Sequence, residues 1–143
     1  MHDLELVRSV IAELQQSSYA ALLIGGWAEE LHGMTQPRPH NDIDVVVLDP
    51  PLDVLDAFVA KRHEVVEKHL SQKRAYLADD VLVELFIATR QGTRFETIWW
   101  GHLHWNWPPD MEPVVIAGLP VASQAVLRGF RQSYAEIIAA RPW

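Results

Sequence analysis

The chain has 143 residues, of which 49% are hydrophobic and 22% are charged, and this balance excludes an intrinsically disordered protein. The formal net charge of −7 argues against a general nucleic-acid-binding surface, which needs clustered Lys and Arg, and favours a small-molecule substrate. Without cysteine, a cleavage site or an apolar run near the roughly 20 residues that cross a bilayer, residues 1–143 are expected to form one cytoplasmic domain with no membrane attachment.

The chain begins with a helical pattern and then a strand pattern. Apolar residues three or four apart predict an amphipathic helix over residues 3–16. The short apolar run 20–24 precedes Gly25 and Gly26, which predicts a buried strand that ends in a tight turn. A short helix over residues 27–32 follows.

The next segment contains Pro37 and Pro39, so it must be extended or turning. The β-branched and apolar run 42–48 predicts a strand, which a pair of prolines ends. Helical spacing then predicts a helix over residues 52–61.

The second half of the chain is richer in strand patterns. Two or three strands are expected, over residues 64–69, 74–77 and 81–88. The aromatic stretch 95–107 resembles a strand that leads into a loop, and residues 114–116 suit one more strand. Residues 123–140 predict a closing helix with Ser123 as its N-cap.

Asp42 and Asp44 are the first residues that suggest chemistry. Side chains two apart on a strand point to the same side, so these carboxylates project together while Ile43 faces the opposite layer. Two adjacent carboxylates repel unless a cation lies between them, and Mg²⁺ prefers carboxylate and phosphate oxygens. The alternative is an exposed strand end at which the two aspartates cap a turn.

Glu84 is the one charged residue in a strongly apolar strand pattern. An ionised carboxylate in such a strand is costly to bury without a cation, a strong donor or a proton. If this strand lies beside the strand with Asp42 and Asp44, Glu84 faces the same metal and can accept the proton of an attacking hydroxyl. The alternative is an edge strand with Glu84 in solvent.

Four residues before the aspartates suit phosphate binding. Gly25 and Gly26 let the backbone approach a ligand closely and present amide hydrogens at a helix start, although any tight turn uses glycine. Arg38 and His40 can meet phosphate oxygens, or can equally be solvated loop residues.

These residues together carry a resemblance to a known family. The ordered combination of Ile24-Gly25-Gly26-Trp27, Gly33 and residues 38–44 (Arg-Pro-His-Asn-Asp-Ile-Asp) resembles the lincosamide and aminoglycoside nucleotidyltransferases of the polymerase-beta-like superfamily. The resemblance spans about residues 20 to 90.

The resemblance implies roles for the matching residues. In that family the glycines line a triphosphate pocket, the paired aspartates bind magnesium, and a later carboxylate activates the hydroxyl of the drug. By position these roles fall on Gly25 and Gly26, on Asp42 and Asp44, and on Glu84. The sequence departs from the family pattern at Glu30, where aspartate is usual, at Met34, where a basic residue is usual, and through the longer loop that contains Pro37.

A second constellation combines His102 and His104 with several tryptophans. A His-X-His pair on a strand can bind a transition metal, but the sequence shows no third ligand nearby. The aromatic residues are more typical of a core, an acceptor wall or a subunit contact.

The sequence thus predicts a mixed α/β (α+β) domain with the nucleotidyltransferase fold, in which a central sheet carries the carboxylates and helices pack on its other side. The predicted activity is magnesium-dependent transfer of a nucleoside monophosphate, expected to be AMP from ATP, to a hydroxyl of a small molecule such as a lincosamide- or aminoglycoside-like antibiotic. The alternatives are a nucleotide-binding module without turnover and a toxin–antitoxin-type enzyme that modifies a protein or an RNA. A homodimer that completes the acceptor pocket is compatible with so short a chain.

Overall fold

The computed structural model describes residues 3–143. Its helices are α1 (Leu4–Gln15), α2 (Gly25–Leu31), α3 (Leu52–Ala60) and α4 (Gln124–Ala139), with a short 3-10 helix, η1 (Val66–Lys68). Its strands are β1 (Ala20–Ile24), β2 (Asp42–Leu48), β3 (His63–Glu64), β4 (Lys73–Ala78), β5 (Val81–Gln91), β6 (Arg94–Trp99), β7 (Leu103–Asn106), β8 (Val114–Ile116) and β9 (Leu119–Val121). Within the same residues, no helix combines the length and the apolar character needed to cross a membrane.

The strands form one mixed sheet in the order β3-β4-β5-β2-β1-β9-β8, and the β6–β7 hairpin continues from β5. The central strands β2 and β5 run parallel, whereas β1 and β4 pair with them in the antiparallel direction. A mixed central sheet with helices confirms the predicted fold class.

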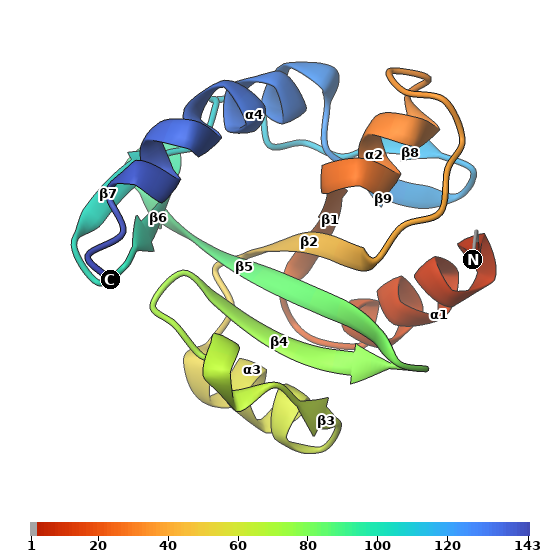
Figure 1. Cartoon of the computed structure of the whole chain (residues 1–143), viewed down its shortest axis with the longest axis horizontal. Helices are drawn as coiled ribbons and strands as arrows, with labels where there is room; N and C mark the ends of the chain where they lie inside the picture. Colours follow the sequence, from red (N-terminus) through yellow and green to blue (C-terminus); the bar gives the residue numbers. More distant parts are fainter. Residues whose placement is uncertain (1–2) are drawn as a thin grey trace.

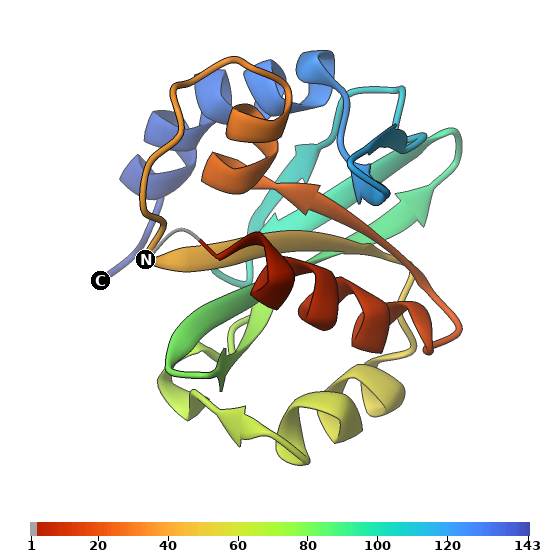
Figure 2. The ribbon, with the colours of Figure 1, turned by 90° about the vertical axis from the view of Figure 1, so that its right-hand side faces the viewer.

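Helices cover the sheet on both sides (Figures 1 and 2). Helices α1 and α3 lie on one side, and α2 and α4 lie on the other, where the carboxylates of β2 also point. The expectation that the helices pack only opposite the carboxylates is therefore wrong. That prediction rested on the apolar face of β2 opposite the aspartates. The side of the sheet with the carboxylates is also partly apolar, because Ile24 and Phe86 lie on it, and α4 covers this surface.

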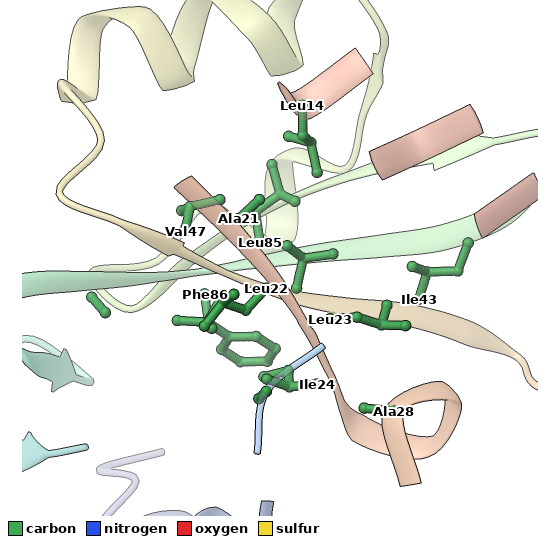
Figure 3. Close-up of a cluster of buried hydrophobic side chains, with 14 of the residues drawn as sticks. Leu14, Ala21, Leu22, Leu23, Ile24, Ala28, Ile43, Val47, Leu85 and Phe86 are labelled. Atoms are coloured by element: carbon green, nitrogen blue, oxygen red, sulfur yellow. The ribbon is translucent and has the colours of Figure 1, made fainter. Parts of the chain in front are cut away.

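The main core lies between the sheet and α1. Leu14 of α1 points toward Ala21 of β1 and Leu85 of β5, while Phe86 lies on the opposite side of the sheet (Figure 3). Leu14 and Leu85 are fully buried. Burial of such side chains stabilises each by about 1.5–3 kcal/mol relative to exposure, and it fixes the register that positions Glu84 one residue before Leu85.

Two segments differ from the sequence prediction. Residues 64–69 are not a strand: only His63–Glu64 pairs with β4, and the chain then turns through η1, where Val66 is 69% exposed. Residues 95–107 form the β6–β7 hairpin rather than a strand and a loop. The hairpin turns at Trp100 and Gly101, which both have positive φ.

Candidate active site

Three carboxylates meet on the two central strands. Asp44 on β2 pairs in register with Glu84 on the parallel strand β5, and Asp42 lies two residues before Asp44 on the same face. One oxygen from each of the three side chains lies within 4.8 Å of the others. The predicted convergence of Asp42, Asp44 and Glu84 is therefore present.

The surroundings of Asp44 disfavour its ionised form. Burial, together with the charges of Asp42 and Glu84, raises the pKa of Asp44 to about 8. The pKa of Asp42 is also raised, first by burial and then by Glu84. Within residues 3–143, no group forms a hydrogen bond with the buried Oδ1 atom of Asp44. Such an acceptor is costly to leave unpaired, and a divalent cation would satisfy it.

Two lysines that the sequence analysis did not identify lie beside Glu84. Lys73 Nζ donates a hydrogen bond to Glu84 Oε2, and Lys68 Nζ lies 3.8 Å from the same oxygen. Lys73 begins β4, which pairs with β5 in the antiparallel direction. Only that register brings Lys73 to Glu84, and the sequence contains no local signal for it.

Gly25 and Gly26 allow two close approaches at the start of α2. Gly25 has a φ of +71°, and a Cβ atom there would lie 2.5 Å from Asp44 Oδ2. A Cβ atom on Gly26 would lie 2.9 Å from both Arg38 Nη2 and His40 Nδ1. The backbone of this turn therefore packs directly on the carboxylate site.

Arg38 and His40 lie behind the turn rather than on the cavity. His40 is buried, its Nε2 atom lies 2.9 Å from Glu30 Oε1, and its ring centroid lies 4.4 Å from that of Trp27. The backbone N–H of Arg38 donates to the same Glu30 oxygen at 3.0 Å. Glu30, a departure from the family pattern, thus holds the loop that leads to Asp42.

A cavity of about 680 Å³ contains the three carboxylates. One wall is a stripe along α4, with residues three or four apart facing the cavity: Leu127, Phe130, Arg131, Tyr134, Ala135 and Ile138. Arg131 donates two hydrogen bonds to the buried Glu29 of α2 and so links the two helices. No local pattern in the sequence indicates this pair, because it depends on the packing of α4 over the sheet.

The histidine pair does not form a metal site. His104 lies on β7 and pairs with Glu96, whereas His102 lies in the preceding turn with its Nδ1 atom 3.1 Å from the Trp100 carbonyl oxygen. Among the described residues, the group with Asp42, Asp44 and Glu84 is the one arranged to hold a metal ion.

The fold of this chain, a mixed sheet with helices packed on it, matches that of solved nucleotidyltransferases. The lincomycin-bound structure of the lincosamide antibiotic adenylyltransferase LnuA is similar to this chain with a TM-score of 0.72 and 12% identity, over 91% of this chain and 86% of LnuA. The structure of ANT(2″)-Ia with adenylyl-2″-tobramycin is similar with a TM-score of 0.65 and 21% identity, over 96% of this chain and 80% of ANT(2″)-Ia. Neither a protein-family model nor a curated protein sequence matches the chain.

The solution structure of ANT(2″)-Ia, an antibiotic-resistance factor, gives a TM-score of 0.66 and 22% identity, over 97% of this chain and 75% of that protein. At these identities the likeness establishes the fold. The nucleotidyltransferase fold predicted from the sequence is therefore confirmed.

Proposed function

We propose that this protein is a magnesium-dependent nucleotidyltransferase that transfers a nucleoside monophosphate, AMP from ATP, to a hydroxyl of a small molecule. The observation that carries the proposal is the half-buried Asp44 carboxylate beside Asp42 and Glu84, whose buried Oδ1 atom has no hydrogen-bond partner within residues 3–143. Three acidic groups this close favour a bound divalent cation over three separate anions.

The residues have distinct roles in this proposal. Asp42 and Asp44 would hold magnesium, which when bound neutralises charge on phosphate oxygens. The turn at Gly25 and Gly26 would bind the β- and γ-phosphates through its backbone. Arg38 and His40 would support the turn from behind and add positive potential to the phosphate site.

Glu84 would act on the acceptor. The acceptor oxygen attacks the α-phosphorus as its proton passes to Glu84, so a new O–P bond forms while the bond to the β-phosphate bridging oxygen breaks and pyrophosphate leaves. Lys73 and Lys68 contact Glu84 Oε2 and so hold this carboxylate in place. Positioning and charge neutralisation supply most of the rate enhancement in such transfers.

The acceptor in this proposal is a molecule of antibiotic size. LnuA is a lincosamide antibiotic adenylyltransferase, and ANT(2″)-Ia is found with adenylyl-2″-tobramycin. The extension to this chain is an analogy between folds.

The direct test is release of pyrophosphate with magnesium, each of the four common nucleoside triphosphates, and a panel of hydroxylated acceptors that includes lincomycin and tobramycin. We expect acceptor-dependent release that Glu84→Gln reduces by about 10²-fold or more. Nucleotide binding with no release for any acceptor would instead favour a binding module. Label incorporated into protein or RNA of a cell extract, with none in small molecules, would favour the macromolecular alternative.

A further inference from the structure

The cavity extends past the carboxylates to an aromatic wall, defined here as Trp100, Tyr134 and Trp143. The indole N–H of Trp100 donates to the Ile137 carbonyl oxygen at 2.8 Å, and the ring centroids of Trp100 and Trp143 lie 5.4 Å apart at nearly a right angle. The backbone N–H of Trp100 also donates to the side chain of Gln72. Contacts with α4 and with the turn before β4 therefore hold Trp100 in place, and its position does not depend on a ligand.

The order of the strands places this wall relative to the glycine turn. The sheet runs β4-β5-β2-β1, Gly25 follows β1, and Gln72, which binds Trp100, precedes β4. The carboxylates on β2 and β5 lie between these two ends. The aromatic wall thus lies on the β4 side of the carboxylates, and the glycine turn lies on the β1 side.

This placement decides whether the nucleotide or the acceptor contacts the aromatic wall, an inference that rests on the function proposed above. In an in-line displacement the attacking oxygen and the leaving group lie on opposite sides of the phosphorus. If pyrophosphate leaves at the glycine turn, the acceptor hydroxyl must enter from the opposite side, past Glu84. The acceptor therefore lies against the aromatic wall.

The chemistry of the wall indicates what the acceptor is. Ala135 and Ile138 also line the cavity and add aliphatic surface to it. Its charged side chains are of both signs, and Lys68 and Lys73 lie beside the carboxylate of Glu84, so the net charge does not select the acceptor. Aromatic faces can bind cations as well as flat rings. Flat apolar rings gain both burial and ring-to-ring contact at such a wall.

We infer that the acceptor is a molecule whose hydroxyl lies next to a flat aromatic ring, and that Trp100, Tyr134 and Trp143 bind this ring.

The test compares probes that differ in the ring alone. Calorimetry on the 143-residue chain, with magnesium and a non-hydrolysable ATP analogue, measures the affinity for 4-nitrophenyl β-D-glucopyranoside, methyl β-D-glucopyranoside and spermidine. We expect the aryl glucoside to bind about tenfold more tightly than the methyl glucoside. Tyr134→Ala and Trp143→Ala should remove most of that preference, since both side chains are substantially exposed and their loss leaves the core intact. Gln132→Ala, on the same helix but off the cavity, is the control and should preserve it.

Equal affinity for the two glucosides, or tighter binding of spermidine, would overturn the inference. Displacement of the aryl glucoside by the ATP analogue would also overturn it, because the wall would then belong to the nucleobase. Repeating the titrations of the two glucosides without the ATP analogue separates the test of the aromatic wall from the test of the proposed function. Failure of the ATP analogue to bind the wild-type chain contradicts the proposed function, whereas the preference between glucosides tests the wall directly.

Discussion

Asp44 is the residue on which the chemistry of the site depends, and its ionisation links the site to stability. Strand alternation was sufficient to predict that Asp42 and Asp44 share a face, because it is a local signal. The convergence of Glu84 with them could be stated only on the condition that the two strands are neighbours, or through the family resemblance. The sequence was not sufficient to predict Lys73 or Arg131, because both reach the site through contacts between elements far apart in the chain.

The raised pKa of Asp44 predicts a pH-dependent free energy of unfolding. Since the folded-state pKa is about 8 and the ordinary value is 3.8, the folded protein binds more protons than the unfolded chain between these values. Stability should therefore fall as pH rises from about 4 to about 8. Urea unfolding at pH 5 and pH 8 in the presence of a chelator measures this, and Asp44→Asn should flatten the dependence. A wild-type slope that survives unchanged in Asp44→Asn would contradict the assignment.

Gly25 offers a second test at the residue scale. Gly25→Ala adds a Cβ atom 2.5 Å from Asp44 Oδ2 at a φ of +71°, whereas Gly92→Ala has a similar φ of +64° with no described atom within 4 Å. The left-handed backbone alone costs about 1–2 kcal/mol, so Gly92→Ala should lose about that much. Gly25→Ala should lose more and should also weaken nucleotide binding. Equal losses in urea unfolding would show that the approach to Asp44 is not tight.

At the scale of elements, the predicted strand 42–48 and the predicted helix 123–140 correspond closely to β2 and α4, including the Ser123 cap. Residues 64–69 were misassigned because adjacent valines suit a strand, yet this segment lies at the edge of the sheet, where few contacts hold an extended chain. Residues 95–107 were misassigned because the hairpin turns at Trp100 and Gly101, both of which have positive φ. Positive φ is unusual for a bulky residue such as Trp100, so Gly101 was the single turn signal in the sequence.

The link between α2 and α4 gives a prediction at this scale. Arg131→Ala would leave the carboxylate of Glu29, which is 4% exposed, without its two hydrogen bonds from Arg131. We expect a loss of about 1–3 kcal/mol in the free energy of unfolding, and a weaker hold of α4 on the cavity. Gln132→Ala on the same helix should change stability by less than about 0.5 kcal/mol. Urea denaturation of both variants measures the difference, and similar values for the two would refute the role of this pair.

At the scale of the whole molecule, the cavity combines residues from both ends of the chain. The glycine turn, the carboxylates, the lysines and the α4 stripe come from segments that only the strand order β4-β5-β2-β1 and the packing of α4 bring together. Sequence patterns indicate each element separately, but the aromatic wall and the lysines depend on this long-range order. The resemblance to nucleotidyltransferases covered about residues 20 to 90, which is why the contribution of α4 could not be predicted from it.

The most direct measurement is the affinity of the wild-type chain and Asp44→Asn for a non-hydrolysable ATP analogue, by calorimetry, with and without magnesium. We expect magnesium-dependent binding in the wild type and none in Asp44→Asn, whose far-ultraviolet circular dichroism spectrum should match the wild type. Equal, magnesium-independent affinities in the two proteins would contradict a metal-bound nucleotide at Asp42, Asp44 and Glu84.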